Sequence, residues 1–190
     1  ARKVESNPEQ FANFWKSSWN SDAYAKAVFE AVEGLIAAGK FTPGDKKIAF
    51  VFEDTDYGKS NTEYALPLFK DAGWTETGHE AVPLGHSDFY PQLSKLRGNA
   101  PDVLVSIFTS VNSGIALTKQ IKETGLDALH VAIYYPLRPE FHEGIGADSE
   151  NMLWTPMLYD PVNNEKHKAL YDMLAEKGIT GTGDHAHGYC

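Results

Sequence analysis

Short apolar runs alternate along the chain with segments of helical periodicity, and this alternation constrains the fold more than any other feature. Residues 48–52, Ile-Ala-Phe-Val-Phe, contain no polar side chain, as is typical of a strand covered on both faces of a sheet. We predict further strands over residues 75–82, 102–108, 129–134 and 152–155. Strands that alternate with helices of this length form βαβ units with right-handed crossovers. The predicted fold class is therefore α/β, a doubly wound parallel sheet with flanking helices.

The helices between these strands are predicted from their apolar spacing and their caps. Residues 22–38 carry apolar side chains at i, i+4, i+7 and i+8, and Gly39 suits the end of a helix. Helices are also predicted over residues 60–72 and 113–124. Ser87 precedes Phe89, Leu93 and Leu96, which predicts a further helix with Ser87 as its N-cap.

The alternation breaks near residue 159, where Tyr159-Asp160-Pro161 is followed by a polar stretch and a helix predicted over 164–176. We therefore predict an α/β lobe with its leading segment over residues 1–158. Residues 159–190 are predicted to be a crossover and the start of a return toward another lobe.

Composition excludes several classes of function. The chain carries 26 acidic and 17 basic residues, a formal net charge of -9, which repels nucleic acid and anionic membrane surfaces. No stretch approaches the roughly 18 apolar residues that span a bilayer, so direct membrane insertion is not expected. Residues 1–5 lack the apolar core of a signal peptide, and any export signal is expected to have been removed or to lie outside this sequence. The single cysteine, Cys190, is expected to have no role.

Ligands of open α/β sheets bind at the carboxyl ends of the strands, where loops and helix N-termini converge. This rule selects the loops at residues 53–59, 84–88, 109–113 and 134–141. In the first loop Tyr57 offers an apolar ring and a hydroxyl to a ligand, and Gly58 permits a tight turn. The alternative is that Asp56 caps the following helix while Tyr57 packs on a neighbouring loop.

The later loops supply hydrogen-bonding and aromatic groups. Thr109 and Ser110 suit a small polar or anionic group, although this loop is equally explained by Ser113 capping the next helix. Tyr134 and Tyr135 follow a predicted strand, where they are expected to form a ligand wall, although aromatic pairs more often serve packing.

Metal and cofactor chemistry find little support. Asp54 and Asp56 permit an Mg²⁺-dependent hydrolase or phosphatase as an alternative, and His185 and His187 beside Asp184 have the generic spacing of a zinc site. The signatures Gly-x-Ser-x-Gly, Gly-x-Gly-x-x-Gly and the phosphate loop are absent from the sequence. We expect no cofactor, no metal and no catalytic residue.

The order of these pieces resembles the type I periplasmic binding proteins, and among them the branched-chain amino acid binding proteins of ABC importers. The resemblance lies in residues 47–51 followed by Asp56-Tyr57-Gly58, in residues 87–89, 101–105 and 120–126, and in their order and spacing. It covers most of the chain and corresponds to the second of the family's two lobes.

The resemblance implies a solute carrier without enzymatic activity, located in the periplasm or outside the cell. Its partners are a small-molecule solute and the membrane permease of an ABC importer. In the family the solute lies between two lobes. Family positions for solute contact correspond here to Tyr57, Ser110 and either Tyr134 or Tyr135. A ligand-sensing receptor or regulator on the same fold is the alternative.

One departure from the family bears on the solute. Family members that bind an α-ammonium group often place a carboxylate near the position of Tyr134 and Tyr135. A desolvated ammonium without a carboxylate partner is poorly compensated. The sequence therefore leaves the solute open between an amino acid, an aromatic acid and an amide-like compound.

Overall fold

The computed structural model describes residues 2–14, 19–155 and 163–178. The chain divides into two compact units, residues 21–156 and residues 1–20 together with 157–190. The smaller unit contains helix α1 (Arg2–Ser6) and helix α7 (Glu165–Glu176). Asn164 caps α7 by accepting hydrogen bonds from two backbone N–H groups, and no residue of α7 is buried. The predicted role of residues 159–190 as a crossover falls largely outside the described residues, as do His185, His187 and Cys190.

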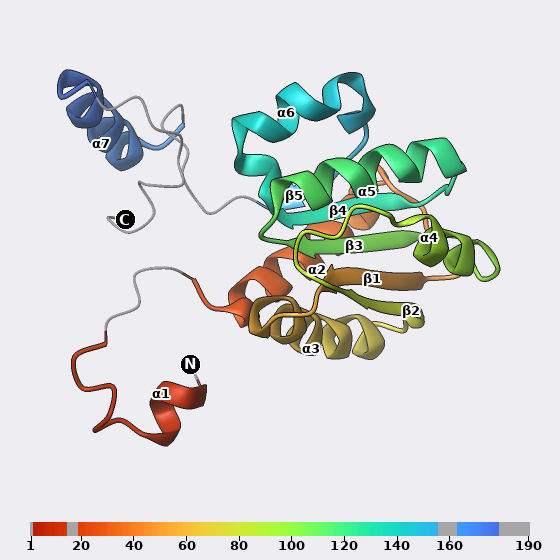
Figure 1. Cartoon of the computed structure of the whole chain (residues 1–190), viewed down its shortest axis with the longest axis horizontal. Helices are drawn as coiled ribbons and strands as arrows, with labels where there is room; N and C mark the ends of the chain where they lie inside the picture. Colours follow the sequence, from red (N-terminus) through yellow and green to blue (C-terminus); the bar gives the residue numbers. More distant parts are fainter. Residues whose placement is uncertain (1, 15–18, 156–162, 179–190) are drawn as a thin grey trace. The chain divides into compact units, whose positions relative to one another are not determined.

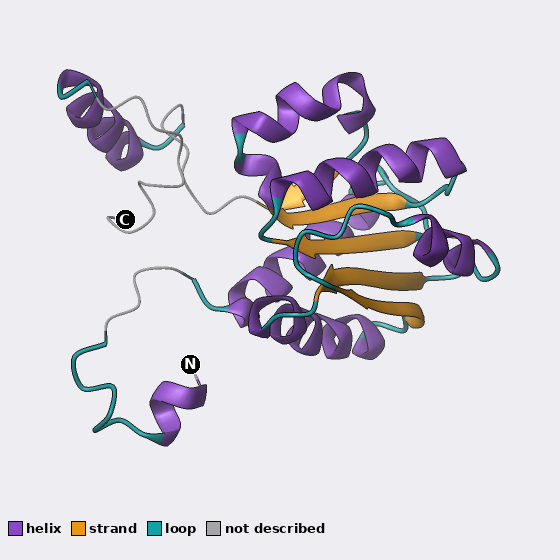
Figure 2. Cartoon of the chain, viewed as in Figure 1, coloured by secondary structure: helices purple, strands orange, loops and turns teal. Residues whose placement is uncertain are grey.

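The larger unit is a five-stranded sheet whose strands are all parallel, in the order β2-β1-β3-β4-β5 (Figures 1 and 2). Its strands are β1 (Lys47–Glu53), β2 (Thr75–Val82), β3 (Val103–Phe108), β4 (Leu129–Tyr134) and β5 (Leu153–Thr155). Its helices are α2 (Ser21–Ala37), α3 (Asp56–Asp71), α4 (Tyr90–Arg97), α5 (Val111–Thr124) and α6 (Pro139–Ile145), with short 3₁₀ turns η1 (Tyr135–Leu137) and η2 (Gly146–Ser149). The predicted doubly wound parallel α/β fold is confirmed.

The core lies on both faces of the sheet, as the uninterrupted apolar strands predict. All residues of β3 and all of β1 after Lys47 are buried. Alternate residues of each strand direct their side chains to the same face of the sheet. On one face, Ala49, Leu104 and Ala132 pack with residues of α4, α5 and α6. Helices α2 and α3 pack together and cover the other face (Figure 1). The carboxyl ends of the central strands are thereby fixed relative to one another.

The start of α4 differs from the prediction because a distant side chain replaces the local cap. The helix begins at Tyr90, and its N-cap position is Phe89, whose side chain makes no capping bond. Gln120 of α5 instead accepts a hydrogen bond from the Phe89 backbone N–H at 2.6 Å and donates one to the Ser87 carbonyl at 2.8 Å. Ser87 is therefore not the N-cap, and the two hydrogen bonds of Gln120 attach this turn to α5.

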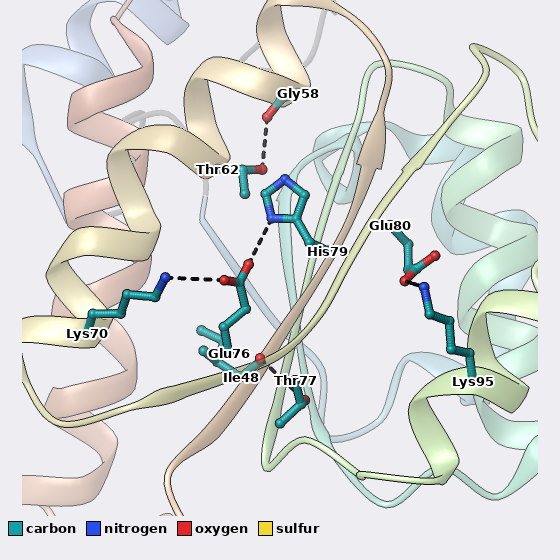
Figure 3. Close-up of polar contacts among 9 residues, drawn as sticks. All are labelled: Ile48, Gly58, Thr62, Lys70, Glu76, Thr77, His79, Glu80 and Lys95. Carbon is teal, nitrogen blue, oxygen red and sulfur yellow. Dashed lines mark hydrogen bonds and ion pairs between the residues drawn. The ribbon is translucent and has the colours of Figure 1, made fainter.

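Charged side chains protect β2, which lies at one edge of the sheet (Figure 3). Glu76 pairs with Lys70 at 3.3 Å and contacts His79 at 2.8 Å. Glu80 of the same strand pairs with Lys95 of α4 at 2.5 Å. Charges along an edge strand discourage pairing with the edge of another molecule.

Asp102 fastens the start of β3 to the turn that leads into β1. Its carboxylate accepts backbone hydrogen bonds from Gly44 (2.6 Å), Asp45 (3.1 Å) and Lys47 (2.8 Å). Partial burial alone raises the pKa of this carboxyl. The three backbone donors and the Lys47 charge outweigh burial, and the pKa lies below its ordinary value.

Asp102→Asn is expected to lower the free energy of unfolding at pH 7 by about 1 kcal/mol, a value reduced by solvent screening at this partly exposed site. Because the folded pKa lies below the unfolded value of about 3.9, the stabilisation is present above that value and is lost as the pH falls through the folded pKa. Urea titrations between pH 7 and pH 3 measure this difference. Asp127→Asn is the control, because the Asp127 side chain is exposed. It should change neither the free energy of unfolding nor its dependence on pH. A pH-independent loss for Asp102→Asn contradicts the ionic role.

Candidate functional site

The carboxyl ends of β1 and β3 meet at one edge of the sheet and are joined there by hydrogen bonds. Glu53, the last residue of β1, accepts a hydrogen bond from the Ser110 backbone N–H at 2.8 Å. Its second carboxylate oxygen accepts one from the Thr109 hydroxyl at 2.7 Å. Thr109 and Ser110 directly follow β3, so the structure brings these two predicted residues to the edge that the sequence selected.

Glu53 itself was not among the residues predicted from the sequence. Its side chain is 0% exposed, although glutamate is rarely buried without a partner. The signal that marks it is an acidic residue directly after a wholly apolar run, at the first position of the selected loop at residues 53–59. Its burial depends on the β3–α5 loop, which the sequence does not place.

Tyr57 lies in the first turn of α3 and packs edge-on against Tyr24 of α2, with ring centroids 6.4 Å apart. Burial raises the pKa of its hydroxyl well above the ordinary value, with smaller contributions from Tyr24, Tyr134 and Glu53. Tyr57 therefore lies within electrostatic range of both Tyr134 and Glu53. Its hydroxyl oxygen is buried and has no hydrogen-bond partner within the described part of the chain.

The turn before Tyr57 depends on Thr55 and Gly58. The Thr55 hydroxyl caps α3 by accepting the Gly58 backbone N–H at 3.2 Å, so Thr55, and not Asp56, is the N-cap. A Cβ atom at Gly58 would lie 2.0 Å from the carbonyl oxygen of Glu53. Only glycine permits this approach of α3 to β1, and the approach sets the position of Tyr57.

Tyr134 ends β4 in a backbone conformation that non-glycine residues rarely adopt, with φ 76° and ψ -58°. These values correspond to a strained γ-turn. Strained residues persist where the surrounding structure enforces them, and they cluster at ligand sites. The strain at Tyr134 therefore agrees with a functional role for this edge.

Tyr135 lies in the core of this lobe, apart from the other four predicted site residues. It is 0% exposed and packs between Phe108 and Phe141. Its hydroxyl lies 2.7 Å from the Ser106 hydroxyl, and burial raises its pKa. The turn at Tyr134 directs the two neighbouring tyrosines differently, so Tyr135 is a packing residue and the expected wall of two tyrosines does not form.

Ser110 is the N-cap of α5, because its hydroxyl accepts the Ser113 backbone N–H at 3.3 Å. Ser113 is not the cap. Its side-chain hydroxyl is buried and unpartnered, as is the hydroxyl of Thr155 at the end of β5. Sequence reasoning identified neither Ser113 nor Thr155 as a site residue. With Tyr57, the carboxyl side of the sheet holds three buried hydroxyls that lack partners among the residues described.

In the described part of the chain, metal ligands do not gather at this edge. Asp54 is exposed and forms an ion pair with Lys59. The described ranges contain no group of three or more histidine, cysteine, aspartate or glutamate side chains suited to a metal ion. The Mg²⁺ alternative that used Asp54 and Asp56 therefore gains no support.

A cavity of about 200 Å³ lies at the opposite, amino edge of the sheet, between α5 and the segments that lead into β4 and β5. His130 lines this cavity and is buried, and burial lowers its pKa to about 3, with a smaller contribution from Lys122. The His130 ring is therefore neutral at physiological pH. The cavity is distinct from the edge that carries Tyr57, Ser110 and Tyr134.

Solved structures of similar fold include solute-binding proteins. A proposed branched-chain amino acid ABC transporter from Silicibacter pomeroyi superimposes with a TM-score of 0.86 at 18% identity, over 99% of this chain and 48% of that one. An R. palustris solute-binding protein in complex with benzoate superimposes with a TM-score of 0.73 at 14% identity, over 92% of this chain and 46% of that one. A leucine-binding protein from Thermotoga maritima superimposes with a TM-score of 0.73 at 20% identity, over 91% of this chain and 48% of that one.

The chain thus spans about half the length of these structures. No curated protein sequence matches it. Among the described residues, no helix has the length and apolarity needed to cross a membrane. The sequence profile of one family matches residues 4–190, nearly the whole chain. This match confirms the resemblance drawn from the sequence, and the chain belongs to the periplasmic binding protein family.

Proposed function

We propose that this lobe binds a small polar solute at the carboxyl edge of its sheet and, together with a second lobe, delivers it to the permease of an ABC importer. The observation that carries the proposal is the unpartnered, buried hydroxyl of Tyr57. Tyr134 and Glu53 contribute to its raised pKa, and Glu53 binds the loop of Thr109 and Ser110. Buried polar groups normally have partners, so a solute that supplies one is bound selectively. Family membership supports the same reading.

The location proposed for the protein is the periplasm or the extracellular space, and catalysis is not expected. The similar structures include a benzoate complex and a leucine-binding protein, so we propose that the solute is an amino acid, an aromatic acid or an amide-like compound. A thermal-shift screen of the two-lobed protein against these three classes tests the function, because a ligand selective for the folded state raises the melting temperature. A screen without any shift contradicts the proposal.

Tyr57→Phe is expected to separate binding from stability. The substitution removes a hydroxyl without a partner in the described structure, so the free energy of unfolding should change by less than about 0.5 kcal/mol. If that hydroxyl binds the solute, affinity should fall roughly five- to tenfold. Calorimetry with the solute found in the screen measures the change.

Tyr90→Phe is the matched control for this prediction. The Tyr90 hydroxyl is exposed and bonds to Glu123, away from the carboxyl-edge residues, so its loss should leave affinity unchanged. Equal affinities for Tyr57→Phe and the unaltered protein remove the Tyr57 hydroxyl from the site.

A further inference from the structure

Glu53 is a buried acid without a cationic partner in the described part of the chain. Both of its carboxylate oxygens accept hydrogen bonds, one from the Ser110 backbone N–H and one from the Thr109 hydroxyl. Lys47 and Lys59, the lysines nearest to it in sequence, pair with Asp45 and Asp54 respectively. A buried charge of this kind is costly unless dipoles or a counter-charge compensate it.

The dipoles come from the start of α5. Ser110 is the N-cap of this helix, and helix N-termini carry partial positive charge that favours anions. Because the Ser110 N–H already donates to Glu53, the protein's own carboxylate occupies this anion-binding position. A solute carboxylate at the same edge therefore meets a negative charge at the place where the Ser110 N–H would otherwise donate to it.

Tyr57 lies close to this charge, because the backbone of its neighbour Gly58 closely approaches that of Glu53. The Tyr57 ring packs edge-on against Tyr24, and Glu53 and Tyr134 both contribute to the raised pKa of Tyr57. The faces of tyrosine rings attract cations. The rings and the buried carboxylate therefore both favour a positively charged group of the solute over a negatively charged one.

We propose that Glu53 is a positioning and specificity-determining residue, which holds the Thr109–Ser110 loop in place and excludes solutes that present an anionic group to this edge, while neutral or cationic groups are admitted. This inference rests on the proposed solute-binding function. It narrows the solute, because an aromatic acid would have to direct its carboxylate away from this lobe.

The test uses Glu53→Gln, which keeps the shape of the side chain and removes its charge. The glutamine amide oxygen still accepts the Ser110 N–H, and its NH₂ group donates to the Thr109 hydroxyl oxygen. Asp54→Asn is the matched control, since it removes a neighbouring carboxylate that is exposed and paired with Lys59.

Benzoate, benzamide and benzamidinium serve as probes, because they share one ring and differ in charge. Dissociation constants measured by NMR titration at low salt should rank benzamidinium tighter than benzamide, and benzamide tighter than benzoate. We expect successive probes to differ by roughly ten- to hundredfold, as a unit charge gives over about 7–10 Å at an effective dielectric constant of about 20. Glu53→Gln should reduce these differences at least about fivefold, while Asp54→Asn retains them.

The positioning role has a readout that needs no solute. The Ser110 amide hydrogen should exchange slowly in the unaltered protein and in Glu53→Gln, and rapidly in Glu53→Ala. Rapid exchange in the unaltered protein overturns the positioning role, whether or not Glu53→Ala folds.

The binding measurements decide the specificity role. An unchanged ranking in Glu53→Gln, or no binding of benzamidinium to the unaltered protein, overturns that role. The proposed function is judged separately, because it fails only if the full solute screen is empty.

Discussion

Replacing Gly58 by alanine should destabilise the protein by about 2–3 kcal/mol, whereas the same replacement at Gly34 should stabilise it by about 0.5–1 kcal/mol. Both glycines lie within helices, α3 and α2. At Gly34 nothing lies within 4 Å of an added Cβ atom, so only the helix propensity of alanine acts. At Gly58 the new atom would lie 2.0 Å from the main-chain oxygen of Glu53, and no rotamer change relieves that contact.

Urea unfolding followed by tryptophan fluorescence measures both changes, since Trp74 is buried and reports on the core. For a chain of this size the loss at Gly58 corresponds to a melting temperature lower by roughly 4–12 °C. The clash also moves the start of α3, so Gly58→Ala should weaken solute binding even where the protein remains folded. If Gly58→Ala stabilises the protein as Gly34→Ala does, this result contradicts the close approach of α3 to β1 in the structure.

The 190-residue chain alone should bind the solute with a dissociation constant roughly two to three orders of magnitude higher than that of a protein with both lobes. Tyr57, Ser110 and Tyr134 lie on one edge of one sheet, so the proposed site offers contacts to only one side of the solute. Sites that bind small molecules well bury roughly 70–90% of the ligand surface. The loss of three or four contacts of about 1 kcal/mol each gives the expected difference.

Calorimetry on both proteins with the same solute measures this difference. The chain spans 48% and 46% of two similar solved structures, which agrees with a site completed by a second lobe. Dissociation constants within threefold of each other contradict the shared site and place the whole site within this lobe.

The sequence alone determined the five strands, the helices α2 to α5 and α7, and their order, but it did not predict α1 or α6. The apolar run at residues 48–52 and the helical spacing over 22–38 are local patterns, and local periodicity specifies whether a segment forms a strand or a helix. The parallel arrangement followed because strands that alternate with helices have few possible connections. The edge that carries Thr109 and Ser110 was predictable for the same reason, since parallel strands end on one side of the sheet.

Only the tertiary structure decided which side chains share that edge and how they are paired. Glu53 is buried because Thr109 and Ser110, more than 50 positions later, satisfy its oxygens. Tyr134 and Tyr135 are adjacent and chemically identical, yet the turn between strand and 3₁₀ helix directs them to different environments. Gln120 replaced the predicted cap at Ser87 in the same way. Each outcome depends on contacts between segments distant in sequence, and local periodicity carries no information about such contacts.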